Sequence, residues 1–305
     1  MRAFLISLVA SVAALTACSR SIPQKDFASA EEAVEALVSA ARSNDTRALL
    51  EVLGSEAQPV VSSGDEVQDA NSRERFLRSY EQAHELDTGA DGATTLEVGA
   101  DEWPFPFPLV QRDGRWRFDS TAGTEEVLNR RVGANELATI QSSLAFVDAQ
   151  REYYALNPES DPLLHYAQKL ISTSGRKDGL YWPTSGNEMP SPLGEEFALA
   201  RAEGYFKDGV AQATPFHGYV YRLLKSQGPN AKGGAYDYMV RNKMLGGFAL
   251  IAVPAEYGSS GVMSFIVNHE GVVYSKDLGE DTVQAASSID SFDPDRSWKR
   301  EASAE

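Results

Sequence analysis

Cysteine is the residue type with the clearest chemical signal, because the chain of 305 residues contains one, Cys18. A single cysteine excludes an internal disulfide and a metal site built from several thiolates. Cys18 follows a cation, Arg2, and an apolar run from Ala3 to Ala14, a pattern typical of a secretory signal too short to span a bilayer as a stable helix. Since an unpaired thiol is a liability after export, we expect Cys18 to be covalently modified.

The residues around this cysteine, "LTAC", resemble the bacterial lipobox, in which a branched residue and two small ones precede an acylated cysteine. The resemblance implies that Cys18 becomes the mature N-terminus and carries diacylglyceryl and N-acyl chains. Several acyl chains, at about 0.8 kcal/mol per buried CH₂, anchor a protein stably. Ser19 stands where an aspartate would indicate inner-membrane retention, so we expect the outer membrane, facing the periplasm. The alternative is a secreted protein with an incidental cysteine.

Two short motifs have spacings associated with catalysis or metal binding. "SGRK", from Ser174 to Lys177, fits S-x-x-K, which in penicillin-recognising enzymes pairs a nucleophilic serine with a lysine base. The SDN and KTG partner motifs are absent, and the polar surroundings favour a loop. "DTGADG", from Asp87 to Gly92, is similar to a calcium loop, but Gly89 stands at a ligand position, which favours a turn that leads into a strand. We therefore predict no catalytic residue, metal ligand or cofactor.

The histidines show no spacing typical of metal ligands such as H-x-x-x-H. They are His84, His165, His217 and His269. We expect His84 and His165 on helix faces, packed or partly exposed, and the other two at the surface beside strands. A pairing of His217 with Asp237 in space stays open at this stage.

The composition is that of a globular chain, with 42% hydrophobic and 24% charged residues. A length of 305 residues predicts two domains of roughly 150 residues each. The 28 Lys and Arg against 44 Asp and Glu give a net charge of -16. Such a balance repels phosphate backbones, so we expect no nucleic-acid partner, and it disfavours a basic patch for anionic lipids.

Residues 25–132 predict a first domain of helices followed by strands. Ser29 and Glu32 form a capping box, after which apolar residues repeat at helical spacing as far as Ala41. A short helix that Gly54 ends and a third that begins near Asn71 are expected next. Strands are predicted over residues 94–98, 103–110 and 115–118, the last two joined by the hairpin turn "RDG".

The stretch "WPFPFPLV" carries prolines at alternate positions, Pro104, Pro106 and Pro108. Because proline lacks an N–H group, all three gaps fall on one edge of an extended chain, which predicts an edge strand with its solvent side blocked. The aromatic residues of this stretch, Trp103 among them, are then expected to pack on the core. The alternative is an aromatic docking segment for a partner.

Residues 133–298 predict a second domain with a long helix and an antiparallel sheet. Asn135 is expected to cap a helix of about twenty residues that ends near Asn157. "DP" at Asp161 and "SP" at Ser191 predict two further helix starts, separated by a long polar loop. Strands are expected in "GYVYRLLKSQ", "GGAYDYMV", "MLGGFALIAVP", "GVMSFIVN" and "GVVYSKDLG", the last three forming a meander.

The predicted fold class is α+β with two domains, each of helices and an antiparallel meander. The predicted segments are a signal peptide at 1–17, an anchor linker at 18–24, the two domains at 25–132 and 133–298, and a tail at 299–305. The first domain resembles the nuclear-transport-factor-two-like cone fold. The second, through "FALIAVPAEYGSSGVMSFIVNHEGVVYSKDLG", is similar to type IV pilin and pseudopilin headgroups, although the hydrophobic spine helix of pilins is missing.

Taken whole, the chain is identified as a member of the bacterial family catalogued as domain of unknown function 2950. The stretches that carry this resemblance include "VGADEWPFPFPLV", "FDSTAGTEEVLNRRVGANEL" and "KDGLYWP". The resemblance covers nearly all of the mature protein and implies no catalytic or binding residues.

Three functions are consistent with these features. The first is a non-enzymatic, lipid-anchored envelope protein that binds another envelope component. The second is a periplasmic small-ligand binder or hydrolase with a cavity in the first domain, lined by residues such as Tyr80, His84, Trp103 and Trp116. The third is a minor-pilin-like adaptor that docks on a secretion or pilus apparatus, for which an exposed apolar patch on the second domain would be the sign.

Overall fold

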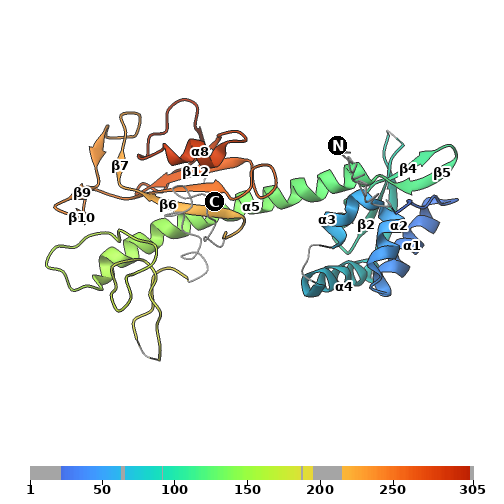
Figure 1. Cartoon of the computed structure of the whole chain (residues 1–305), viewed down its shortest axis with the longest axis horizontal. Helices are drawn as coiled ribbons and strands as arrows, with labels where there is room; N and C mark the ends of the chain where they lie inside the picture. The colour runs from blue at the N-terminus through green and yellow to red at the C-terminus, as the bar shows by residue number, and fades with distance from the viewer. Residues whose placement is uncertain (1–21, 63–65, 91, 187, 195–214, 303–305) are drawn as a thin grey trace, which may run out of the picture. The chain divides into compact units, whose positions relative to one another are not determined.

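The computed structural model describes residues 22–62, 66–90, 92–186, 188–194 and 215–302 (Figure 1). The chain divides into two compact units, Met1–Val127 and Leu128–Glu305. Cys18 and Ser19, and with them the predicted signal and anchor, lie outside the described residues. Among the helices that are described, none combines the length and apolarity needed to cross a membrane.

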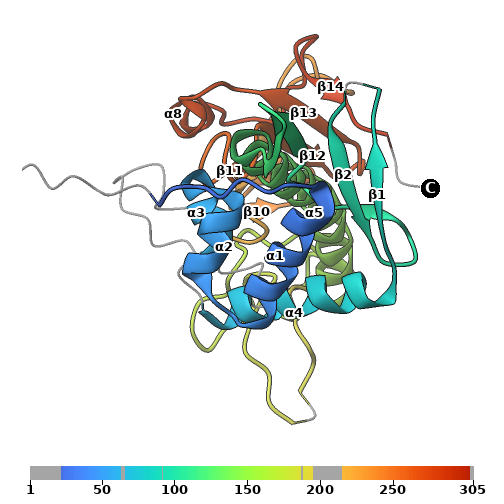
Figure 2. The same ribbon diagram turned by 90° about the vertical axis from the view of Figure 1, so that its right-hand side faces the viewer.

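In the first unit, helices precede an antiparallel sheet, as predicted. The helices are α1 (Ala30–Arg42), α2 (Thr46–Leu53), the 3₁₀ turn η1 (Ser55–Ala57), α3 (Gln58–Val61) and α4 (Glu66–Gln82). The strands are β1 (His84–Thr88), β2 (Thr94–Val98), β3 (Trp103–Pro104), β4 (Leu109–Arg112) and β5 (Arg115–Phe118), in the order β1-β2-β4-β5 with β3 also paired to β2. Figure 2 shows α1 between α2 and α4, and the β1–β2 hairpin beyond the end of α4.

The capping box confirms its sequence prediction. The Ser29 hydroxyl accepts a hydrogen bond from the Glu32 amide at 3.1 Å, and the Glu32 carboxylate accepts one from the Ala28 amide at 2.8 Å. Helix α4 begins five residues before the predicted Asn71. Strand β1 was not predicted, because its residues HELDT are mostly polar and exposed and carry no alternation of apolar residues.

The proline-rich stretch forms two short strands, where the sequence predicted one. No strand is formed over residues 105–108, since the prolines cannot donate to a ladder. Phe107 is fully buried and Phe105 partly so, which confirms the core contact for these two rings. Trp103 differs, with 61% of its surface exposed. Gly123 accommodates the Phe107 ring, because a Cβ atom there would lie 2.0 Å from it.

The second unit contains most of one long helix and a five-stranded antiparallel sheet. Helix α5 (Ser120–Leu156) begins in the first unit, and α8 (Thr282–Ser287) follows the last long strand. The strands are β6 (Tyr219–Leu224), β7 (Ser226–Gln227), β8 (Tyr236–Asp237), β9 (Met239–Val240), β10 (Lys243–Met244), β11 (Ala249–Pro254), β12 (Met263–Asn268), β13 (Val273–Asp277) and β14 (Lys299–Arg300). The main sheet has the order β14-β13-β12-β11-β6, and two-residue ladders join β7 to β8 and β9 to β10.

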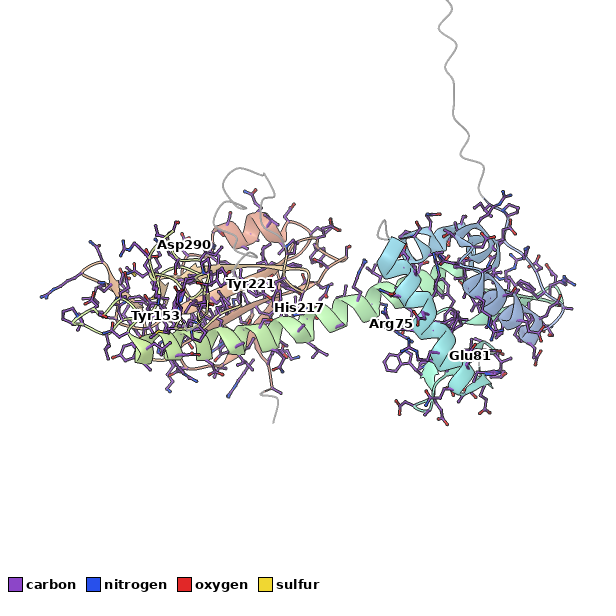
Figure 3. All side chains as sticks on the ribbon, turned by 90° about the horizontal axis from the view of Figure 1, so that it is seen from below. Arg75, Glu81, Tyr153, His217, Tyr221 and Asp290 are labelled. Atoms are coloured by element: carbon purple, nitrogen blue, oxygen red, sulfur yellow. The ribbon has the colours of Figure 1, made fainter. Side chains whose placement is uncertain are left out.

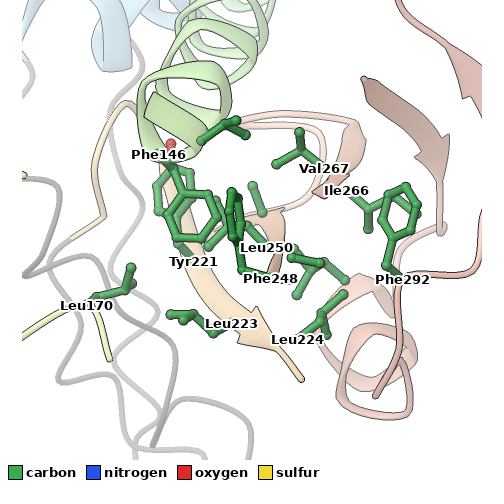
Figure 4. Packing of buried hydrophobic residues seen from close by; sticks show 14 of the residues in the cluster. Phe146, Leu170, Tyr221, Leu223, Leu224, Phe248, Leu250, Ile266, Val267 and Phe292 are labelled. Carbon is green, nitrogen blue, oxygen red and sulfur yellow. The ribbon is translucent and has the colours of Figure 1, made fainter. Parts of the chain in front are cut away.

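The predicted meander is confirmed in β11, β12 and β13, and α5 packs on this sheet. Phe146 of α5 meets Phe248 edge-on, with ring centroids 5.6 Å apart, as Figure 4 shows beside Tyr221. On the side of α8, the Arg222 guanidinium donates to the carbonyls of Ala286 and Ile289, both at 2.8 Å. The α+β fold class with two antiparallel sheets is therefore confirmed.

Helix α5 begins at Ser120, fifteen residues before the predicted cap at Asn135, so that prediction was wrong. The Asp119 carboxylate accepts a hydrogen bond from the Ala122 amide at 3.1 Å and caps the helix instead. Asn135 lies inside the helix and donates its side-chain amide to the Ser260 carbonyl at 2.9 Å. An asparagine can cap a helix or bond a distant part of the chain, and sequence alone does not distinguish these two roles.

The other predicted helix starts also differ. No helix follows Asp161, because its carboxylate accepts from the Leu163 amide two residues on and its own amide donates to Asn157, which closes a local turn. The helix expected after Ser191 falls mainly on residues 195–214, outside the described residues. Residues 299–300, assigned from sequence to a tail, form β14 and pair with β13.

One buried side chain on α5 holds the following segment against the helix. The Gln150 amide donates to the Ala167 carbonyl and accepts from the Ala167 amide, both at 2.9 Å, and Gln150 is fully buried. Replacing Gln150 by alanine should therefore lower the free energy of unfolding by about 2–4 kcal/mol, since both Ala167 groups would be left unpaired. Urea denaturation measures this loss.

The matched control is Glu152→Ala, an exposed position on the same helix, which should change stability by less than about 0.5 kcal/mol. Equal losses in the two variants would contradict the assigned role of Gln150.

Candidate functional site

Of the four residues predicted to line a cavity in the first unit, Tyr80, His84 and Trp103 lie around one end of β2, where His84 and Trp103 both pair with Val98, and Trp116 lies on β5. Tyr80 and His84 stack with ring centroids 3.9 Å apart, and His84 begins β1 on an exposed surface. Trp103 is exposed, and the partly buried Trp116 exchanges backbone hydrogen bonds with Phe27 at 2.8 and 2.9 Å. These contacts are those of a folded surface and do not build a shared pocket.

Two open hollows mark the surface of the first unit. One, of about 470 Å³, lies along α1 beside Tyr80 of α4. The other, of about 370 Å³, lies at the start of α5. The second is polar and includes two arginines, but Arg117 pairs with Asp26 at 2.6 Å and Arg112 faces Asp119 at 3.7 Å. Both arginines therefore already have carboxylate partners, and the Glu56 carboxylate also lines the hollow, so it offers no net positive charge to a ligand.

The catalytic candidates of the second unit are also not assembled. His217 lies in the turn before β6, whereas Asp237 lies in β8, paired with Ser226 beyond the other end of β6. Figure 3 labels His217 beside a more N-terminal part of α5 than Tyr153. Ser174 is in an exposed loop, as predicted, and the Lys177 ammonium lies 5.4 Å from the Trp182 ring. Among the described residues, no group of His, Cys, Asp and Glu is arranged to hold a metal ion, and Asp91 of the "DTGADG" turn is outside them.

Four exposed apolar side chains of the second unit belong to segments that contact one another near the end of α5. They are Tyr154 at the end of α5, Leu163 and Leu164 in the segment after it, and Val240 in β9, with exposed fractions of 36%, 52%, 40% and 45%. We call these four residues the hairpin surface, after the β9–β10 hairpin.

Hydrogen bonds join the β9–β10 hairpin to the segment after α5, and these two parts carry three of the four side chains. The Tyr166 amide donates to the Met244 carbonyl at 2.9 Å, and the Gln168 side chain donates to the Asn242 carbonyl at 2.9 Å. Tyr154 packs on Tyr166 with ring centroids 4.9 Å apart. In Figure 1 the hairpin lies beyond the same end of the second unit as the end of α5.

A buried imidazole lies beneath the hairpin surface. The His165 side chain is 4% exposed, its Nδ1 lies 3.0 Å from the Tyr166 carbonyl, and its Nε2 lies 3.1 Å from the Lys243 ammonium. A carbonyl only accepts and an ammonium only donates, so both contacts are satisfied by the tautomer with its hydrogen on Nδ1. Lys243 also bonds the Asp161 carboxylate at 2.6 Å. His165 was predicted on a helix face, and the structure instead places it in this network.

Ion pairs continue this network away from the hairpin. Arg176 pairs with Glu159 at 2.8 Å, and Lys169 pairs with Asp178 at 2.8 Å. Burial alone would raise the pKa of Asp178, but hydrogen bonds from Lys169 and from the amide and hydroxyl of Thr173 outweigh it and lower the pKa to about 2. The carboxylate is therefore held ionised as part of the scaffold.

The arrangement is suited to holding a surface in place. Both ring nitrogens of His165 are engaged, Nδ1 by the Tyr166 carbonyl and Nε2 by the Lys243 ammonium, so the imidazole has no free nitrogen to act as a base toward another group. Burial raises the pKa of the Tyr153 phenol, which donates to the Lys177 carbonyl at 2.8 Å, so it is not available as a base. The part of this region that stays accessible is the hairpin surface.

Sequence reasoning missed this site, although one signal was present. The pair Leu163-Leu164 lies between an Asx turn and a histidine, without helical or strand periodicity to bury it. Apolar residues that no element can bury are expected at the surface. The contribution of Val240 could not be foreseen, because it depends on how β9–β10 packs on a segment seventy residues earlier.

The lowered pKa of Asp178 predicts a pH-dependent contribution to stability. Because the pKa is lower in the folded chain than the ordinary 3.8, the contribution is complete above about pH 5 and is lost as the pH falls toward 2. Asp178→Asn should therefore cost about 1–2 kcal/mol at pH 7 and progressively less between pH 4 and pH 2. Unfolding free energies measured across this range test the prediction.

Asp148→Asn is the matched control, since the Asp148 side chain is 77% exposed and pairs with Arg151 on the helix surface. It should leave stability nearly unchanged at every pH. A pH-independent difference between Asp178→Asn and the wild type would contradict the charge-based account.

Comparison with known proteins identifies the family of this chain. No curated protein and no solved structure gives a significant match to the chain. The model of the family described as "Protein of unknown function (DUF2950)" matches residues 24–301, which include both compact units almost entirely. The chain therefore belongs to the DUF2950 family.

Proposed function

We propose that this protein is a lipid-anchored adaptor of the bacterial cell envelope that binds another envelope protein through its hairpin surface and catalyses no reaction. The observation that carries the proposal is the exposure of Tyr154, Leu163, Leu164 and Val240, on segments that hydrogen bonds and a ring contact join. The "LTAC" sequence at Cys18 supports the anchor, and Ser19 supports the outer membrane facing the periplasm.

The physical argument for a protein partner is the cost of leaving this surface in water. At the exposed fractions given above, the four side chains together present on the order of 300 Å² of accessible area, and the largest apolar patch of a typical monomer has about this size and is often functional. Tyrosine is enriched at protein interfaces because it adds large contact area with few rotatable bonds. A partner that covers the surface would gain this burial without any rearrangement of the scaffold.

The finer resemblances of the two units belong to the same proposal. A long helix packed on an antiparallel meander supports a pilin-headgroup-like second unit, and the helices and curved hairpins of the first support a cone-like one. A pilin-headgroup-like unit with an exposed apolar surface favours docking on a secretion or pilus apparatus as the setting of the adaptor.

The anchor is tested by growing cells with a clickable palmitate analogue. Wild-type protein should be labelled and Cys18→Ala should not, because the thioether to diacylglycerol requires the thiol. Ser21→Ala, three residues away, serves as the control and should be labelled like the wild type. An unlabelled wild type would contradict the lipid anchor.

The docking surface is tested by photocrosslinking in cells, with p-benzoylphenylalanine in place of Val240. A discrete adduct with one envelope protein is expected, and Leu164→Asp should lower its yield about tenfold, because a carboxylate cannot be desolvated against an apolar partner without cost. The matched control is Leu137→Asp, an exposed leucine on α5 outside the hairpin surface. The adduct yield of Leu137→Asp should equal that of the chain that carries only the crosslinker. An equal loss of adduct in both variants would contradict the proposal.

A further inference from the structure

The tip of the β9–β10 hairpin is an unusual two-residue turn. Arg241 and Asn242 connect the strands, and both have positive φ, 48° and 61°. Turns of this type favour Asn-Gly, since glycine has no Cβ to crowd the left-handed conformation. Asparagine fits its position, whereas arginine at the first position carries a conformational cost that glycine would avoid.

The Arg241 guanidinium gains nothing inside the chain that offsets this cost. Arg241 is exposed and forms no hydrogen bond or ion pair within the part of the chain that the structure describes. Neighbouring cations differ, because Lys243 and Arg176 each have a carboxylate partner. The carboxylates of Asp161 and Glu159 in this network therefore already have cations as partners.

The hairpin also holds this arginine in a defined place. Below the tip, Lys243 bonds Asp161 at 2.6 Å, and the Asn242 carbonyl accepts from Gln168 at 2.9 Å. Val240, the residue before Arg241, belongs to the hairpin surface. The backbone of the hairpin thus places a cation next to Val240, in a chain whose net charge is -16.

We infer that Arg241 is the charge-recognition residue of the hairpin surface, and that the partner is a protein segment with a carboxylate beside its apolar side chains. The inference rests on the proposed function. Charge complementarity supports the inference. The apolar contact supplies affinity, while a guanidinium that binds a carboxylate through two parallel hydrogen bonds fixes the position of the partner along the surface. An excess of acidic residues elsewhere in the chain would repel such a partner from other surfaces, so the cation also directs where it docks.

The experiment uses the same in-cell crosslinker at position 240 in the full chain. Arg241→Glu should lower the adduct yield about tenfold or more, and Arg241→Lys should lower it less, since lysine keeps the charge and loses the planar fork. Arg241→Gly separates recognition from folding: it relieves the backbone of the turn, so it should keep or raise the melting temperature and still lose the adduct. Arg296→Glu is the matched control, an exposed arginine of the same unit outside the hairpin surface, and should keep the wild-type yield.

Each result decides a separate point. Wild-type yield in both Arg241→Glu and Arg241→Gly, with loss in Leu164→Asp, would overturn the inference and leave the proposed function standing. An adduct peptide that contains neither Asp nor Glu, identified by mass spectrometry, would also overturn it. No adduct with the unsubstituted chain, or an adduct with phospholipid in place of protein, would overturn the proposed function and the inference together.

Discussion

The contact of the Lys243 ammonium with Asp161 and His165 is the interaction on which the hairpin surface depends. Strands β9 and β10 have two residues each, and a hairpin of that length has no stability of its own in water. The ammonium lies 2.6 Å from the Asp161 carboxylate and 3.1 Å from the His165 imidazole, which joins the hairpin to the segment after α5. His165 is buried, whereas the Lys243 and Asp161 side chains are 31% and 23% exposed, so the contact is partly shielded from water.

This contact works because α5 provides a fixed base for the segment it holds. Gln150 binds the backbone of Ala167 from the helix, and Tyr153 binds the Lys177 carbonyl farther along. A segment without helix or strand ladders thus has its buried polar groups satisfied by side chains of α5.

Sequence predicted the parts of this structure that depend on local pattern. Strand β2 and strand β5 lie where alternation and turn residues placed them, and the Ser29 capping box begins α1 as expected. Local pattern failed where a residue has a distant partner. Asn135 bonds Ser260 inside a helix that it was expected to begin.

The candidate site was beyond sequence reasoning for the same reason. His165 was expected on a helix face, and its position is instead set by Lys243, which lies 78 residues later in the chain. Asp161 was expected to begin a helix and instead closes a turn. A charge network of this kind has no periodicity, because its members come from a loop and a short hairpin that pack only in the folded chain. Cys18 is the reverse case, because the lipid attachment predicted for it depends on the neighbouring residues alone.

Hydrogen exchange read by mass spectrometry tests the central claim most directly, namely that the hairpin surface is a docking surface. The full chain is measured alone and after incubation with detergent-solubilised cell envelope, followed by recapture. The account predicts slower exchange over residues 161–168 and 239–244 in the recaptured sample, with exchange in α1 and β2 unchanged. Unchanged exchange over both hairpin segments, with slowing confined to the first unit, would contradict it.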